Sequence, residues 1–217
     1  MTTAWITGAG GAWGGAIARA LLEGGHDVVA LGRHDVPALA AYAAELGRSW
    51  TFQRFDLSDP EAQPPDGLPG IFIHAAVSTE GDLNALARAD YLGPATLIDT
   101  AARRMQRRGC GRIGVLVPQN ARLGLAGLGN FSAPQSALWT WCEARREELA
   151  KDARHVTLTV VIPGRTPSPT QRFVAERSGH EARLSPPAAE PLVGAILAGK
   201  RRAGRRPYLA AAAMLVR

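Results

Sequence analysis

Short apolar runs alternate with stretches of helical periodicity along most of the chain. Apolar residues bounded by glycine or polar residues predict strands at residues 4–7, 28–31, 50–55, 71–73, 113–117 and 157–162. Apolar positions at helical spacing predict helices at 16–22, 38–46, 82–108 and 131–153, with a further helix at 191–197 and an edge strand at 207–211. Strands that alternate with helices form right-handed crossovers, so we predict an α/β fold with a doubly wound parallel sheet of about seven strands.

No linker or repeat divides this pattern, so residues 1–217 are expected to form a single domain. The segment 163–187 departs from the pattern, because it is rich in proline and has no clear periodicity. Such a segment after a long strand predicts a loop or lid over a site.

The composition excludes several classes of protein. With 46% hydrophobic residues the chain can bury a full core, and no apolar run approaches the roughly 20 residues of a membrane-spanning helix. The first residues lack the features of a signal peptide, and Cys110 and Cys142 are too few for a disulfide framework or a cysteine metal site. The five histidines show no close ligand spacing. We therefore expect a cytoplasmic protein without a membrane anchor or a bound metal.

The formal net charge is +6, and almost all of the positive charges are arginines, because Lys151 and Lys200 are the only lysines. The arginines are densest at residues 103–112 and 200–206. Clusters of this kind can bind nucleic acid, but solvated helix faces and helix C-termini account for them more simply. No aromatic-rich binding pattern or zinc finger accompanies them, so we do not expect a nucleic-acid partner.

A glycine-rich loop at residues 8–15 follows the first strand and leads directly into the first helix. This arrangement receives a pyrophosphate, because backbone N–H groups and the helix dipole face the anion and missing β-carbons allow close approach. The loop therefore predicts nucleotide binding on a sheet of Rossmann-type topology.

Residues 7–14, with the sequence Thr-Gly-Ala-Gly-Gly-Ala-Trp-Gly, resemble the Thr-Gly-x-x-x-Gly-x-Gly fingerprint of the short-chain dehydrogenase/reductase family. Ala12 stands where the family usually has its middle glycine. Trp13 stands where the family usually has an isoleucine close to the nicotinamide ring. The resemblance thus implies a nicotinamide cofactor, and the indole of Trp13 is expected to crowd the nicotinamide pocket and to weaken or abolish binding of that end.

Further family landmarks follow in order and cover almost the whole chain. Arg33, after the second strand, stands where the family senses the adenosine ribose, and an arginine there favours NADP over NAD. Asp56 and Leu57 resemble the pair that contacts adenine, and Pro163-Gly164 resembles the pair after the sixth strand. The cofactor-binding residues that the resemblance implies are Thr7, Gly8, Gly10, Gly11, Ala12, Trp13, Gly14, Arg33, Asp56, Leu57, Ala75 and Ala76.

The family's catalytic tetrad of Asn, Ser, Tyr and Lys is replaced at every position. The Tyr-x-x-x-Lys motif falls on Phe131 and Gln135, the serine on Pro118 and the asparagine on Asp90. Phenylalanine has no ionisable hydrogen, glutamine has no charge with which to lower a neighbour's pKa, and proline has neither a hydroxyl nor an N–H group. A general acid alone contributes about 10² to 10⁴ in rate, so the usual carbonyl reduction is not expected.

Other residues are candidates to replace this machinery. His74 and Asp90 could form an acid/base pair, Ser132 is adjacent to the vacant tyrosine position, and Arg165 could bind an anionic substrate. A tyrosine and lysine from elsewhere in the chain would also restore the chemistry, the candidates being Tyr91, Tyr208, Lys151 and Lys200.

Two functions therefore remain open. The first is an NADP(H)-binding protein without the Ser-Tyr-Lys machinery, acting as a non-catalytic partner or regulatory subunit for a small-molecule ligand or an active relative. The second is a divergent NADPH-dependent oxidoreductase, or a non-redox lyase or isomerase, that uses Asp90, His74 or both. Trp139, Trp141 and Cys142 lie in the helix that forms subunit interfaces in the family, which predicts a homo-oligomer or a hetero-oligomer.

Overall fold

A wholly parallel sheet of seven strands forms the centre of the computed structural model, which describes residues 2–123, 125–179 and 183–204. The strand order β3-β2-β1-β4-β5-β6-β7 reverses beside β1, as in a doubly wound sheet, so the predicted fold class is confirmed. The predicted strand at 207–211 lies outside the described residues. The strands are β1 Thr3–Thr7, β2 Asp27–Gly32, β3 Trp50–Arg54, β4 Ile71–His74, β5 Gly111–Leu116, β6 Val156–Ile162 and β7 Arg202–Gly204.

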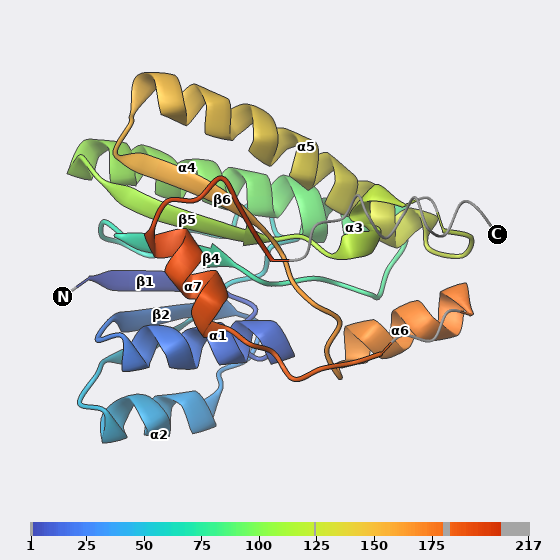
Figure 1. The fold of residues 1–217 in the computed structure, drawn as a ribbon, viewed down its shortest axis with the longest axis horizontal. Coiled ribbons are helices and arrows are strands. Elements are labelled where there is room, and N and C mark those ends of the chain that lie inside the picture. The colour runs from blue at the N-terminus through green and yellow to red at the C-terminus, as the bar shows by residue number, and fades with distance from the viewer. Residues whose placement is uncertain (1, 124, 180–182, 205–217) are drawn as a thin grey trace.

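Helices cover both faces of this sheet (Figure 1). α1, α2 and α7 pack on one face, and α4 and α5 pack on the other. α6 lies beyond the carboxyl ends of the strands (Figure 1). The helices are α1 Ala12–Glu23, α2 Pro37–Glu45, α3 Leu83–Ala87, the π-helical turn η1 Arg88–Leu92, α4 Gly93–Arg108, the 3-10 turn η2 Gln119–Arg122, α5 Gly129–Asp152, α6 Pro169–Ser178 and α7 Glu190–Leu197.

The two faces of the sheet have separate cores because side chains alternate along each strand. Trp5 and Phe72 point to the face covered by α4 and α5, and Ile6 and Ile73 point to the face covered by α1 and α7. All four are at most 1% exposed. Because the central strands are covered on both sides, they read as continuous apolar runs rather than as an alternating pattern.

Two predicted segments differ in the structure, and the strand β7 was not predicted. The helix predicted over 82–108 is interrupted by the turn η1, which places Asp90 in the interior. The proline-rich segment 163–187 contains the helix α6, whose first turn is capped by Ser168 Oγ accepting from Gln171 N at 3.1 Å. No residue of α6 is fully buried, so the helix has no apolar periodicity by which the sequence could reveal it.

Several of the clustered arginines hold segments of the fold together. The guanidinium of Arg104 lies 5.2 Å from the ring of Trp5 and donates to Gly67 O at 3.1 Å. Arg112 Nε donates to Leu197 O at 2.9 Å, which joins β5 to the end of α7. Arg202 Nη2 lies 2.8 Å from Glu143 Oε2 and joins β7 to α5. These arginines therefore have structural partners, and Arg112 and Arg202 lie on strands rather than on the helix faces and helix ends that the sequence predicted.

The contact between Gly14 and the first glycine of the loop generates a prediction about stability. A β-carbon at Gly14 would lie 2.0 Å from Gly8 O, so Gly14→Ala forces α1 away from β1 and should lower the unfolding free energy by about 3 kcal/mol. Gly194→Ala is the matched control, because no atom lies within 4 Å of the added methyl in α7. The control should raise stability by about 0.5–1 kcal/mol through helix propensity. Urea denaturation measures both, and equal effects of the two variants would contradict the proposed packing.

Candidate functional site

The glycine loop lies at the carboxyl edge of the sheet, between β1 and α1. Gly8 has φ +75°, and a β-carbon there would lie 2.5 Å from Ala76 N, so only glycine fits. Gly11 N donates to Gly8 O at 2.9 Å and closes the turn. α1 starts without a side-chain cap, which leaves its first N–H groups available to an anion.

A cleft of about 390 Å³ opens beside this loop, where the strand order reverses. Ligands of doubly wound sheets bind at this position. Eight of the predicted cofactor-binding residues line the cleft: Gly8, Gly10, Gly11, Arg33, Asp56, Leu57, Ala75 and Ala76.

The other four predicted cofactor-binding residues do not line the cleft. Thr7 is 1% exposed, and its Oγ1 shares a hydrogen bond of 2.9 Å with His74 Nδ1. Ala12 begins α1, and Gly14 packs on the Gly8 carbonyl. Trp13 points to the other side of the crevice, where its Nε1 donates to Gly164 O at 3.0 Å.

Arg33 is exposed at the end of β2 and faces the cleft. The neighbouring carboxylate of Asp35 does not line the cleft. Its Oδ1 accepts from Val36 N at 2.7 Å and from Trp50 Nε1 at 3.0 Å. The carboxylate of Asp35 is therefore engaged by these two donors, and Arg33 is a cation that faces the cleft.

Asp56 lines the same end of the cleft. Its Oδ1 accepts from Ser58 N at 2.9 Å and from Ser58 Oγ at 2.8 Å, and these hydrogen bonds lower the pKa of Asp56. The charges of Arg33 and Arg54 lower the pKa further. Asp56 is therefore an ionised acceptor, suited to the amino group of a base such as adenine.

Asp90 lies at the inner end of the cleft and is 1% exposed. Ser78 N donates to Asp90 Oδ1 at 2.8 Å. Burial raises the pKa of Asp90 to about 7, although Ser78 and the nearby Gln135 amide lower it. The amide of Gln135 is near enough to affect this pKa but lies outside hydrogen-bonding geometry, so Asp90 Oδ2 and Gln135 Nε2 lack partners among the described residues. The structure thus brings together two of the four tetrad positions.

His74 is the buried end of β4 and does not line the cleft. Burial lowers the pKa of His74 to about 4, so the imidazole is neutral at pH 7. Its Nε2 has no hydrogen-bond partner within the described part of the chain. Of the acid/base pair that the sequence suggested, His74 and Asp90, only Asp90 therefore lines the cleft.

The remaining tetrad positions lie outside the cleft as well. Phe131 is 2% exposed, and its ring centroid lies 5.6 Å from that of Phe173 in α6. Ser132 is buried, and Pro118 is half-buried at the start of η2. Neither these residues nor the alternative donors Tyr91, Lys151 and Lys200 line the cleft, and Tyr208 lies outside the described residues.

The helix expected to form a subunit interface turns two of its three named residues inward. Trp139 and Cys142 are 4% and 0% exposed, and both belong to the core beneath α5. Burial raises the pKa of the Cys142 thiol, which makes it inert. Trp141 is half-buried and packs against the same core. An interface on α5 would therefore rest on other residues of that helix.

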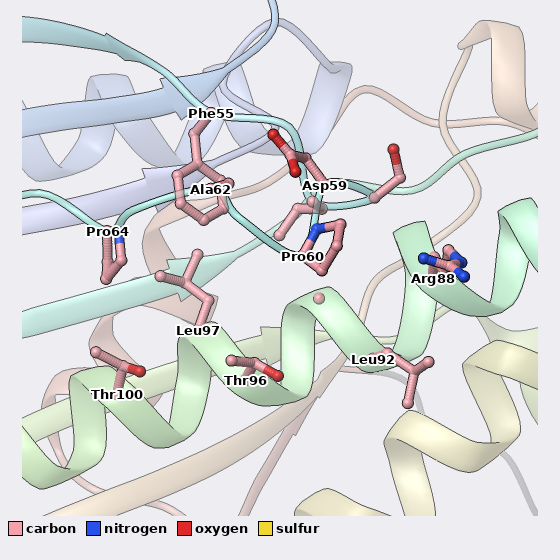
Figure 2. Close-up of a pocket in the computed structure, with 13 residues that line it drawn as sticks. Phe55, Asp59, Pro60, Ala62, Pro64, Arg88, Leu92, Thr96, Leu97 and Thr100 are labelled. Carbon is pink, nitrogen blue, oxygen red and sulfur yellow. The ribbon is translucent and has the colours of Figure 1, made fainter.

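A second cavity, of about 180 Å³, lies on the far side of the segment that carries Asp56. It separates residues 55–64 from the start of α4, and Figure 2 shows Phe55, Leu97 and Leu92 among its apolar walls. A β-carbon at Gly93 would lie 1.8 Å from Leu57 O, so the two walls meet closely at the bottom. This cavity lies beside the cleft at the glycine loop and has less than half its volume.

Two kinds of feature were not found among the described residues. None of the helices in residues 2–123, 125–179 and 183–204 has the length and apolar character needed to cross a membrane. Within the same ranges, histidine, cysteine and acidic side chains nowhere gather in groups of three or more that could hold a metal ion.

The opposite pKa shifts of His74 and Asp90 predict how stability depends on pH. His74 has a folded pKa of about 4 and an unfolded pKa of 6.5, so its contribution to the unfolding free energy is lost as pH falls from 6.5 to 4. Asp90 has a folded pKa of about 7 and an unfolded pKa of 3.8, so its contribution is lost as pH rises through that window. Between pH 4 and about 6.5 the two contributions to the unfolding free energy change in opposite directions and offset each other. Above pH 6.5 the contribution of His74 is constant, and only that of Asp90 continues to fall.

Variants separate the two contributions in urea denaturation at a series of pH values. Asp90→Asn should leave an unfolding free energy that rises by about 3 kcal/mol from pH 4 to 6.5. His74→Asn keeps an acceptor near Thr7 and should give a free energy that falls by about 4 kcal/mol from pH 4 to 7. Profiles of both variants that match the wild-type profile would show that neither group is shifted as described.

We compared the chain with protein families, curated proteins and solved structures, and only the solved structures gave matches. No family model and no curated protein matches the chain. Among solved structures, a protein described as a short chain dehydrogenase/reductase family protein is 25% identical, with TM-score 0.70 and 94% of each chain covered. A short-chain dehydrogenase from Sphingobium yanoikuyae in complex with NADPH is 22% identical, with TM-score 0.77 and 99% of this chain and 91% of that chain covered.

A third solved structure gives the same result. A variant of actinorhodin polyketide ketoreductase with NADPH is 18% identical, with TM-score 0.75 and coverage of 93% of this chain and 94% of that chain. These structures match the chain over nearly its whole length, and the sequence motifs occur on the fold in the family's order. The chain therefore has the fold of the short-chain dehydrogenase/reductase family.

Proposed function

We propose that this protein binds a phosphorylated adenine nucleotide of the NADP class and does not itself reduce carbonyl groups, acting instead as a non-catalytic partner or regulatory subunit. The observation that carries the proposal is a contrast within one crevice. The residues suited to the adenosine half of the nucleotide line an open cleft. The positions that would transfer a proton hold Asp90, Pro118, Phe131 and Gln135.

Nucleotide binding is supported by the glycine loop and by the charge at the outer end of the cleft. The uncapped start of α1 and the glycine turn suit a pyrophosphate. Arg33 suits a 2′-phosphate, because Asp35 is engaged by Trp50 and does not compete for the ribose. Two of the solved structures with this fold are complexes with NADPH, which supports the same ligand class here.

Loss of carbonyl reduction is supported by the side chains that replace the tetrad. A bound reduced nicotinamide supplies a hydride, but the carbonyl oxygen must also receive a proton from the protein. Phe131 has no proton to transfer and is packed against Phe173. Gln135 carries no charge, and Pro118 offers neither a hydroxyl nor an N–H group. A general acid contributes about 10² to 10⁴ in rate, so the usual reaction would be slower by at least this factor.

A second candidate function rests on Asp90. Its carboxyl lines the cleft and has a pKa of about 7, so both the acid and the base form are populated near neutral pH. A divergent reductase, or a lyase or isomerase, could use this group for proton transfer. His74 would not assist as a second titrating group, because its imidazole remains neutral above pH 4 and lies outside the cleft.

Turnover assays with the purified protein distinguish the two functions. With NADPH and a broad panel of aldehydes and ketones, we expect saturable binding in a titration of the protein's tryptophan fluorescence and no oxidation of NADPH above the background rate. Phe131→Ala is the matched variant, and it should leave this background unchanged. Turnover that is lost in Asp90→Asn but kept in Phe131→Ala would establish the second function and overturn the first.

A charge substitution tests the assigned orientation of the nucleotide. Arg33→Ala should weaken binding of adenosine 2′,5′-bisphosphate about tenfold or more, because a charge-assisted phosphate contact is lost, and should barely change binding of ADP. Arg54→Ala is the control, because Arg54 is also near Asp56 but does not line the cleft. Calorimetric titration measures the affinity of each of the two variants for each of the two ligands. An equal loss of affinity for the bisphosphate in both variants would show that Arg33 does not contact the 2′-phosphate.

A further inference from the structure

We infer that the crevice accepts only the adenosine-phosphate half of a dinucleotide, so that the preferred ligand is a phosphorylated adenosine nucleotide without the nicotinamide half. This inference rests on the proposed nucleotide binding and specifies its ligand. It follows from which strand ends the cleft reaches and from what covers the others.

The topology determines where the two halves of a dinucleotide would lie. A pyrophosphate on the glycine loop lies above β1, at the reversal of the strand order. The adenosine half then extends over the ends of β2 and β3, where Arg33 and Asp56 line the cleft. The second half has to extend in the opposite direction, past β4 and over the ends of β5 and β6.

The cleft extends from the ends of β2 and β3 to the segment 75–90 that follows β4, and it does not reach the ends of β5 and β6. Its lining comes from residues 8–90, with Thr170 as the one later member among the described residues. The ends of β5 and β6, and the segments 117–120 and 163–166 that follow these strands, contribute nothing to it. The inner end of the cleft is Asp90, beneath the position where the second half would begin its path.

Trp13 covers the start of that path. The side chain comes from the first turn of α1, and its Nε1 donates to Gly164 O at 3.0 Å. The indole therefore spans from the glycine loop to the segment after β6. A ligand that entered here would have to displace an aromatic ring and leave the Gly164 carbonyl without its present donor.

A second aromatic contact lies between α5 and α6. Phe131, at the start of α5, and Phe173, in α6, have ring centroids 5.6 Å apart with the planes inclined at 59°. Phe131 is 2% exposed, so the ring is buried where α5 begins. The contact also holds α6 against α5. The Trp13 contact thus covers the start of the path, and the Phe131–Phe173 contact packs the region between α5 and α6.

Calorimetric titration of the purified full-length chain with adenosine 2′,5′-bisphosphate, NADP and NADPH tests the inference. The three ligands should bind within about threefold of one another, because the nicotinamide half adds no contacts. The nicotinamide fluorescence of NADPH should not change on binding. An affinity for NADP or NADPH at least tenfold above that for the bisphosphate would overturn the inference and leave the proposed function intact. Failure of all three ligands to bind would overturn both.

Variants at the first contact identify what closes the path. Trp13→Ile shortens the side chain and removes the N–H donor, and in combination with Phe173→Ala it should raise the affinity for NADPH about tenfold relative to the bisphosphate. Trp13→Phe keeps a ring and should change this ratio less. Trp141→Phe is the matched control, because Trp141 is a half-buried tryptophan of α5 that does not line the cleft. Circular dichroism confirms that each variant is folded, and an unchanged ratio in the folded double variant would overturn the inference.

Discussion

The site depends on the close approach of three backbone segments at the end of β1. Gly8 lies against the backbone of Ala75 and Ala76 after β4, and Gly14 of α1 lies against the Gly8 carbonyl. Neither approach leaves room for a β-carbon. Because these contacts are between backbones, they fix the direction of α1 and the width of the crevice independently of most side chains. The cleft, its uncapped helix end and the position of Trp13 all follow from this packing.

Several polar side chains of this protein are buried near the positions that the resemblance assigns to the family's proton-transfer residues. Burial shifts the pKa values of two of them from those of exposed side chains. Asp90 and His74 are both 1% exposed, and burial favours the neutral form of each. Gln135 Nε2 and Ser132 Oγ are buried without hydrogen-bond partners among the described residues. Buried polar atoms without partners are rare in proteins and tend to mark functional positions. Here Gln135 occupies the position that the resemblance assigns to the family's lysine, and Ser132 lies next to the position that it assigns to the tyrosine.

The positions of most strands and the type of fold could be predicted from the sequence, because they depend on local patterns. Apolar runs alternating with helical periodicity identified six strands of the parallel sheet, and the glycine loop predicted a phosphate site at the end of β1. The substitutions at Phe131 and Gln135 were visible for the same reason, since a missing hydroxyl or charge is a property of the residue itself. Eight of the cofactor-binding residues predicted from local motifs line the cleft.

Other features depend on residues that are distant in the sequence, and only the tertiary structure shows them. The hydrogen bond from Trp13 to Gly164 joins positions 151 residues apart, and the contact of Phe131 with Phe173 joins two different helices. The π-helical turn that buries Asp90 interrupts a periodicity that otherwise predicts one continuous helix. The sequence determined which groups are present in the crevice. Long-range packing and the resulting desolvation decided which of them a ligand can reach and which of them are charged.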